Sequence, residues 1–376
     1  MAPEKLLTAA LNTPLDFLLP ALHQLDLLLD CAVRNMQGQQ QDTSSFRGLY
    51  ISGEDVAHAL SQSPETMPFS IDPAMVRELP GSNSGQSSPL TMLVEHLGLS
   101  QFEADLIILT LAPEVNLRYE KIFAYLQDDV TRKRPTVELA LNLFCFSAEE
   151  KLQRRSSFSL EAPLFRSGLA RLIPDPNQVE PPLLAYYLRL DDQVTRQLLG
   201  DSGLDSRLTP FCEISRDYGD DQSPLSAETR HALATLIQQA HQQQQALRLY
   251  FQGAAGTGKL QTAQSLAAAA GDELLIVDAP RLLEHSSASE LIKVLLREVR
   301  MRSPLLYISN LDDVKPDVAA TRQSDLFNLV TEYEGITILA GRNAWVPRAS
   351  ASFGIKPVIF DALSFKESQA CWEKEL

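Results

Sequence analysis

Residues that could do chemistry gather in a glycine-rich loop in the second half of the chain. Gly253, Gly258 and Lys259 give the spacing G-x-x-x-x-G-K directly after the apolar run LRLYFQ. Glycines let backbone N–H groups face inward around phosphate oxygens without Cβ clashes, and the lysine supplies a point charge for the β- and γ-phosphates. A helix that begins here adds the positive end of its dipole. The expected phosphate-binding loop consists of Gly253, Ala254, Ala255, Gly256, Thr257, Gly258, Lys259 and Leu260.

Leu260 departs from the pattern of a magnesium-dependent loop. A serine or threonine normally follows the lysine, because its hydroxyl binds Mg²⁺. Leucine has no lone pair to offer, and Thr262 would face about 200° away around the helix. Mg²⁺ commonly keeps several waters and binds substrate phosphates, so ATP remains the expected ligand while the use of Mg²⁺ stays open. We therefore assign no metal ligand.

The strand that should carry catalytic carboxylates also departs from expectation. The apolar run LLYIS ends at Ser309 and is followed by Asn310, where a hydrolytic enzyme would have an aspartate and a glutamate. Neither residue can act as a metal carboxylate or a general base. Asp312 and Asp313 come later and would serve only if the strand ended further along the chain. No residue is therefore assigned a catalytic role, and the use of Asp312 or Asp313 stays an alternative.

Strand-like runs alternate with helical segments from residue 226 onward. The runs are LRLYFQ, LLIVD, LLYIS, ITILA and VIFD, and each gap is long enough for a helical crossover. Ser226 is an expected cap for the amphipathic helix that contains Leu233 and Ile237. The alternation predicts a three-layer α/β domain with a five-stranded parallel sheet. Ligands bind at the carboxyl ends of the strands in such sheets, which is where the glycine loop falls.

The first half of the chain has a mainly helical pattern. Leucines recur at helical spacing from Leu15 to Met36, and Gly98 followed by the capping-box pair Ser100 and Glu103 indicates a tight turn between two helices. Further helices are expected over 118–129 and from Pro135. Together these elements predict a mainly α, winged-helix-like domain.

Composition restricts the class of partner. The formal net charge of −15 disfavours nucleic acid or an anionic membrane as the main partner. Arg132, Lys133 and Arg134 form the densest basic run, so weak DNA binding stays an alternative. No apolar run reaches the roughly 18 residues of a membrane helix and no signal peptide is evident, so we expect a cytoplasmic protein. The four separated cysteines have neither zinc nor disulfide spacing.

Residues from about 226 to the end resemble the large subdomain of an AAA+ ATPase, a P-loop NTPase. The resemblance rests on the glycine loop, on LLYISNLDDV as the second motif, and on ITILAGRNAW as the strand that usually ends in a polar sensor, for which Asn343 is the nearest candidate. The segment from Phe102 to Phe144 resembles the winged-helix-type domain that precedes the ATPase modules of large bacterial AAA proteins. The resemblance implies ATP binding, assembly with other AAA+ subunits or domains, and a protein partner for the N-terminal domain.

The expected organisation is an N-terminal domain over residues 1–205, a linker over 206–225 and an AAA+ P-loop domain over 226–376. The family's helical lid, second sensor and arginine region would come after SFKESQACWEKEL, so we expect a truncated module without the lid. Three functions stay open. They are an oligomeric ATP-binding module with impaired hydrolysis, an active ATPase that uses Asp312 or Asp313, and an interaction or DNA-binding adaptor with a vestigial loop.

Overall fold

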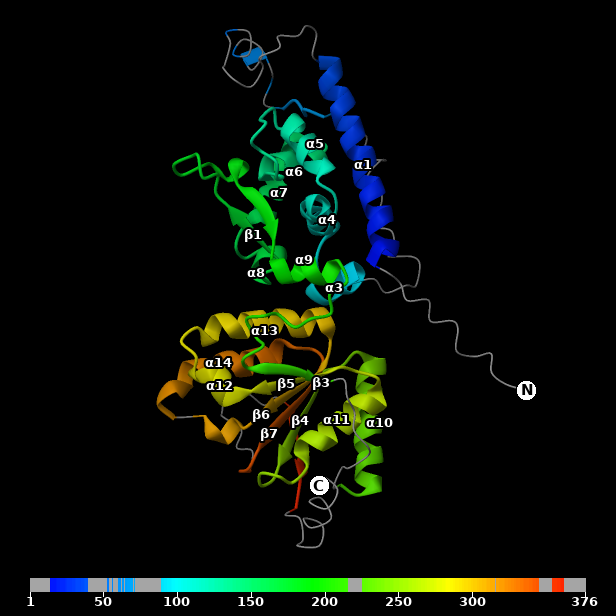
Figure 1. Ribbon diagram of the computed structural model, residues 1–376, viewed down its shortest axis with the longest axis vertical. Helices are drawn as coiled ribbons and strands as arrows, with labels where there is room; N and C mark the ends of the chain where they lie inside the picture. Colours follow the sequence, from blue (N-terminus) through cyan, green and yellow to red (C-terminus); the bar gives the residue numbers. More distant parts are fainter. Residues whose placement is uncertain are drawn as a thin grey trace, which may run out of the picture. The chain divides into compact units, whose positions relative to one another are not determined.

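The protein folds into two compact units, Met1–Gly203 and Leu204–Leu376. The computed structural model in Figure 1 describes residues 14–39, a few positions between 53 and 71 that include 65–69, and residues 89–215, 225–314, 316–344 and 354–361. The segment SFKESQACWEKEL lies outside these residues.

The first unit is built around helix α4. The first helices of this unit are α1 (Pro14–Gln39), α3 (Pro89–Leu97), α4 (Gln101–Val115), α5 (Arg118–Leu126), α6 (Val137–Phe144) and α7 (Ala148–Arg154). Most of α4 is buried, and α1, α5 and α6 all contact it. The leucines of α1 repeat every three or four residues, and this spacing places them on one face of the helix. Leu18, Leu22, Leu25 and Leu29 are buried on that face.

The predicted turn before α4 is confirmed. Gly98 adopts a left-handed φ of +60°, and the side chain of Ser100 accepts a hydrogen bond from the N–H of Glu103. Glu103 Oε2 accepts from the backbone N of Ser100 at 2.9 Å, which completes the capping box. Glu103 Oε1 accepts from the N–H of Leu164 at 3.1 Å, so this buried carboxylate also fixes a segment far along the chain.

Two short strands follow helix α7 in the first unit. Strand β1 (Ala170–Ile173) pairs antiparallel with β2 (Tyr187–Leu190), and Thr136 adds an isolated bridge to Tyr187. Thr136 caps α6, which starts at Val137 rather than at Pro135 as the sequence suggested. The remaining short elements are η2 (Arg155–Phe158), α8 (Pro163–Arg166), η3 (Leu183–Ala185) and α9 (Asp192–Leu198).

The second unit contains a mixed sheet with the strand order β3-β5-β6-β7-β4-β8. Its strands are β3 (Cys212–Ser215), β4 (Leu247–Gln252), β5 (Leu274–Asp278), β6 (Leu305–Ser309), β7 (Ile336–Gly341) and β8 (Lys356–Ile359). All pairs are parallel except β3 with β5, which is antiparallel. The prediction of a purely parallel, five-stranded sheet was therefore wrong by one antiparallel edge strand.

Strand β3 lies in the stretch that the sequence marked as a linker, 206–225. The composition there is polar and rich in turn formers, and the strand has only the four residues CEIS, so the sequence pattern did not indicate it. The segment before β3 is fixed by a buried ion pair between Asp205 Oδ2 and Arg297 Nη2 at 2.5 Å. Burial opposes ionisation of Asp205, but hydrogen bonds from Arg207 and the charges of Arg207 and Arg297 hold its pKa below the ordinary value.

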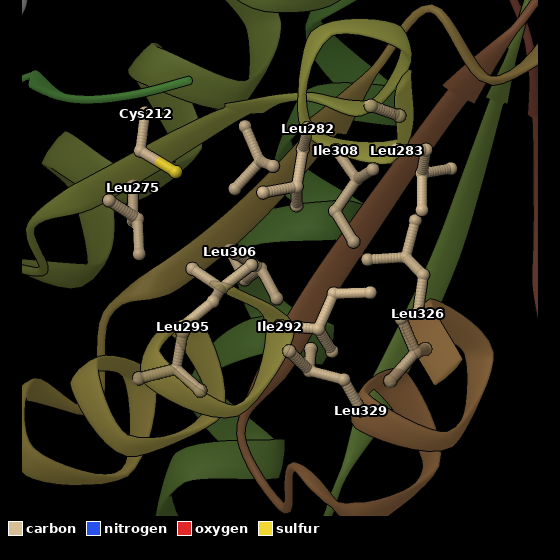
Figure 2. Packing of buried hydrophobic residues seen from close by; sticks show 14 of the residues in the cluster. Cys212, Leu275, Leu282, Leu283, Ile292, Leu295, Leu306, Ile308, Leu326 and Leu329 are labelled. Atoms are coloured by element: carbon tan, nitrogen blue, oxygen red, sulfur yellow. The ribbon is translucent and has the colours of Figure 1, made fainter. Parts of the chain in front are cut away.

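Helices cover both faces of the sheet. They are α10 (Ala227–Gln243), α11 (Lys259–Ala270), α12 (Ala279–Glu284), α13 (Ala288–Arg302) and α14 (Pro316–Glu332), with the short η4 (Leu311–Asp313) after β6. Because side chains alternate along a strand, Leu274 packs with α10 and α11, whereas Leu275 packs with α12, α13 and α14. Figure 2 shows the cluster on the face that α12, α13 and α14 cover. Leu306 and Ile308 of β6 belong to it, together with Leu282, Ile292, Leu295 and Leu326.

Ser226 caps α10 as predicted, because its side chain accepts a hydrogen bond from the N–H of Thr229 at 3.2 Å. Leu233 and Ile237 of this helix are buried on the sheet, which confirms the expected amphipathic face. Strand β8 starts at Lys356, two residues before the predicted run VIFD. The three layers therefore agree with the α/β architecture that the sequence indicated.

Candidate phosphate-binding site

The glycine loop leaves the sheet at the carboxyl end of β4, between β7 and β8. Gln252 pairs with Gly341 of β7 and with Ile359 of β8. The N–H of Gly253 continues this ladder and donates to the carbonyl of Gly341 at 3.0 Å. The loop thus sits inside the parallel part of the sheet, at the edge where such sheets bind ligands.

Backbone geometry explains the glycines of the loop. Gly256 has a φ of +78° and Gly258 a φ of +74°, values that residues with a Cβ rarely adopt. A Cβ atom on Gly253 would lie 2.7 Å from the carbonyl oxygen of Phe360, the residue directly after β8. This close approach excludes a side chain at position 253. Gly258 precedes the first residue of α11, Lys259. These features fit a backbone cradle for phosphate oxygens at a helix N-terminus.

Lys259 points back over the loop. Its Nζ donates to the carbonyl oxygens of Gly253 at 2.7 Å and Ala254 at 2.6 Å, and lies 3.4 Å from Thr257 Oγ1. Thr257 is buried and donates to the Ala254 carbonyl, whereas residues 254–256 are exposed. Partial burial lowers the pKa of Lys259, and the positive charge of Arg342 lowers it further. The ammonium is therefore held by carbonyl oxygens of its own loop, at the N-terminus of α11.

The groups after the loop do not fit a magnesium ion. Leu260 is partly buried and packs against the core of α10 and α11. The hydroxyl of Thr262 is buried and donates to the carbonyl of Gly258 at 2.9 Å, so it is directed into the helix, as expected. Mg²⁺ requires oxygen ligands, and the side chain at position 260 supplies none.

The end of β6 supplies no carboxylate at the expected positions. Ser309 is the last residue of the strand, and its hydroxyl donates to the carbonyl of Val277 in β5 at 3.0 Å. Asn310 is exposed and adopts a left-handed φ of +58°, which starts the η4 turn. Asparagine tolerates this conformation better than most residues, so its role here is that of a turn residue.

Asp312 closes the turn that follows β7. Its Oδ2 accepts hydrogen bonds from the N–H groups of Arg342 and Asn343, and its Oδ1 accepts from Asn343 Nδ2 at 3.1 Å. The hydroxyl of Tyr250 donates to the Asn343 carbonyl at 2.8 Å. Burial, together with the charge of Asp312, raises the pKa of Tyr250 to about 12. Asp312 is thus occupied by three donors, and Asn343, the expected sensor, is held by the same turn.

Asp313 pairs with Arg342, whose Nη2 lies 3.0 Å from Asp313 Oδ2. Both side chains are largely exposed. The sequence did not single out Arg342 as a site residue. The signal that could have found it is a basic residue directly after a parallel strand, because the ends of neighbouring parallel strands meet at one edge of the sheet.

The basic run of the first unit is paired with acidic groups. Arg132 Nε lies 3.3 Å from Asp129 Oδ2, and Arg134 Nη1 lies 3.4 Å from Glu114 Oε1. Lys133 is exposed. Two of the three cations therefore face carboxylates of their own unit.

A comparison with known families covers the first unit. The family described as "winged helix domain, variant" matches residues 4–212, which is more than half of the 376 residues. The chain belongs to this family, and the expected winged-helix character of the first half is confirmed. The match ends before the glycine loop. A comparison with curated protein sequences gave no match.

Within the parts of the chain that the structure describes, no helix has both the length and the apolar character needed to cross a membrane.

Proposed function

We propose that the second unit binds ATP as an AAA+ P-loop module with impaired hydrolysis, and that it acts as a regulatory or structural part of a larger ATPase assembly. One juxtaposition carries the proposal. A glycine loop with its lysine leaves β4. At the same edge, β6 ends in Ser309 and is followed by Asn310, where carboxylates were expected. Backbone amides and a lysine suffice to grip phosphates. Hydrolysis also needs a placed metal and a group that activates water.

The active-ATPase alternative is less well supported. Asp312 is engaged by the turn after β7, and Asp313 is paired with Arg342. Either carboxylate would have to leave these partners before it could bind a metal or orient a water molecule.

The proposal extends to partners and location. The winged-helix unit would contact a protein partner, and the P-loop unit would assemble with other AAA+ subunits or domains. A cytoplasmic location fits the free thiols of Cys31, Cys145 and Cys212, because reduced cysteines persist there.

Thermal unfolding of the full chain tests ATP binding. ATP at 1,000 times its dissociation constant would stabilise the second unit by about 4 kcal/mol, which corresponds to roughly ten degrees for a unit of this size. We expect Lys259→Ala to remove most of this shift. Lys293→Ala is the matched control, because Lys293 is an exposed lysine that pairs with Glu290 at the surface of α13, away from the glycine loop in sequence.

Inorganic triphosphate should reproduce part of the shift, because the contacts assigned to the loop are made to phosphate. A transition that millimolar ATP leaves unmoved, with or without Mg²⁺, contradicts the proposal. An equal loss of the shift in the Lys259→Ala and Lys293→Ala variants would place the nucleotide elsewhere.

The family match favours a second candidate function, an adaptor whose winged-helix unit carries the activity while the loop is vestigial. Nucleic acid is a weak candidate as its partner, because Arg132 and Arg134 face carboxylates and the chain has a net charge of −15. We expect duplex DNA to bind weakly and to dissociate at moderate salt. A tight, sequence-dependent gel shift at physiological ionic strength would favour the adaptor.

A further inference from the structure

Arg342 lies beside the phosphate loop because of strand register. Gly341 is the last residue of β7, and it pairs with Gln252, the last residue of β4. Gly253, the residue directly after β4, donates its N–H to the Gly341 carbonyl at 3.0 Å. The first residue beyond β7 and the first residue of the loop therefore leave the sheet side by side.

The backbone that carries Arg342 is held firmly. Its N–H and that of Asn343 donate to Asp312, and Tyr250 donates to the Asn343 carbonyl at 2.8 Å. Gly341 has no room for a side chain, because a Cβ atom there would lie 2.8 Å from Asp312 Oδ2. The start of the arginine side chain is thus fixed at the edge of the loop.

The guanidinium group of Arg342 is less constrained than its backbone. The Arg342 side chain is 57% exposed, and its Nη2 lies 3.0 Å from Asp313 Oδ2. Exposed ion pairs contribute little to stability, so a multiply charged anion can compete with Asp313 for this group.

Lys259 and Arg342 influence each other electrostatically. After burial, the charge of Arg342 is the next cause of the lowered pKa of Lys259. Two like charges repel each other, and an anion that binds both of them relieves the repulsion.

The same edge offers poor ligands for a divalent cation. Leu260 packs into the core, the hydroxyl of Ser309 donates to the Val277 carbonyl, and that of Thr262 donates to the Gly258 carbonyl. Asp312 is engaged by three donors. The loop carries Lys259, and the residue directly after β7 is a second cation, Arg342. A metal-dependent site would instead combine the lysine with a hydroxyl and a carboxylate.

We propose that this site binds a nucleotide polyphosphate without a divalent cation, and that Arg342 leaves Asp313 to supply the second positive charge. This inference rests on the proposed ATP-binding function. It assigns to Arg342 a direct contact with phosphate, and to Asp313 the role of a counter-ion that competes with the ligand.

Calorimetric titration of the full chain with ATP tests the inference, once in excess Mg²⁺ and once in a chelator. We expect the affinity in the chelator to equal or exceed that in Mg²⁺, because free ATP carries more negative charge than its magnesium complex. Arg342→Ala should weaken binding in the chelator by about tenfold to a hundredfold, the usual range for the loss of a charge-assisted contact. Asp313→Asn should bind ATP more tightly than the unmodified chain, because it frees the guanidinium. Lys293→Ala, at the surface of α13, is the matched control and should leave the affinity unchanged.

The outcomes separate this inference from the proposed function. ATP binding that depends on Lys259 but requires Mg²⁺ overturns the metal-free site and leaves the ATP-binding function standing. Binding that Arg342→Ala leaves unchanged overturns the role of Arg342 alone. A chain that binds no ATP in either buffer overturns the proposed function, and the inference falls with it.

Discussion

The loop after β4 and the turn after β6 lie at one edge of the same sheet, with only β7 between them. The first carries groups that suit a phosphate, namely two left-handed glycines and a lysine over the loop. At the second, strand β6 ends in Ser309 and Asn310 starts the turn. The next carboxylate, Asp312, holds the neighbouring turn after β7. Phosphate binding and hydrolysis require separate sets of groups, so a sheet edge can hold one set without the other.

The difference also shows how a charged side chain changes its role with position. Asp312 lies only a few residues beyond the strand end, yet its oxygens face the N–H groups of Arg342 and Asn343. A carboxylate surrounded by donors stabilises a backbone turn. Four variants or conditions test this contrast.

Gly253→Ala should have the largest effect. A Cβ atom there would lie 2.7 Å from the Phe360 carbonyl, so β8 or the loop must shift. Overpacking of this kind costs about 1–3 kcal/mol, and we expect a transition several degrees lower together with loss of the ATP-induced shift. Thermal scans with and without ATP measure both. Ala255→Gly, at an exposed position of the same loop, should retain the shift. A Gly253→Ala variant whose transition still shifts with ATP would contradict phosphate binding by the loop after β4.

Asp312→Ala should have the next largest effect. The substitution removes the acceptor of three hydrogen bonds at the end of β7, so we expect a loss of roughly 1–3 kcal/mol in the free energy of unfolding. Asp313→Ala removes only an exposed pair with Arg342 and should cost about 1 kcal/mol or less. Urea denaturation measures both. Equal stabilities for the two variants would show that Asp312 does not hold the turn, and would return it to the list of catalytic candidates.

A smaller effect concerns pH. Burial and the charge of Arg342 lower the pKa of Lys259, so its ammonium loses the proton below the ordinary value of 10.5. The positive charge is present at low pH and is lost as the pH rises through the lowered pKa. ATP affinity should therefore fall as the pH is raised from about 7 to 10, whereas Lys259→Arg should give a flatter profile because arginine keeps its charge. Parallel profiles for the two proteins would mean that Lys259 does not contact the nucleotide.

The smallest expected effect is turnover. Position 260 offers no oxygen to a metal, and Ser309 and Asn310 cannot activate water. Steady-state phosphate release should therefore match that of Lys259→Ala, at a protein concentration that permits assembly. The triple variant Leu260→Thr, Ser309→Asp, Asn310→Glu would recover activity only where a neighbouring subunit supplies an arginine, since such groups act as a unit. Clear turnover by the unmodified chain that depends on Lys259 would assign catalysis to Asp312 or Asp313.

The sequence by itself determined the features that depend on neighbouring residues. The capping box of Ser100 and Glu103, the cap at Ser226 and the glycine loop are each contained in a few consecutive positions, and local geometry dictates their residue types. The five parallel strands followed from the alternation of strand-like and helical runs. These predictions needed no knowledge of which segments meet.

Tertiary structure alone decided which groups share the site. Strand β3 was hidden in a polar segment, because its place at the sheet edge depends on its pairing with β5 and on the contact of Asp205 with Arg297. Arg342 lies beside the loop only because β7 is inserted next to β4. Both facts depend on pairings between residues far apart in the chain, and such pairings are set by the packing of the whole unit rather than by local conformational preference.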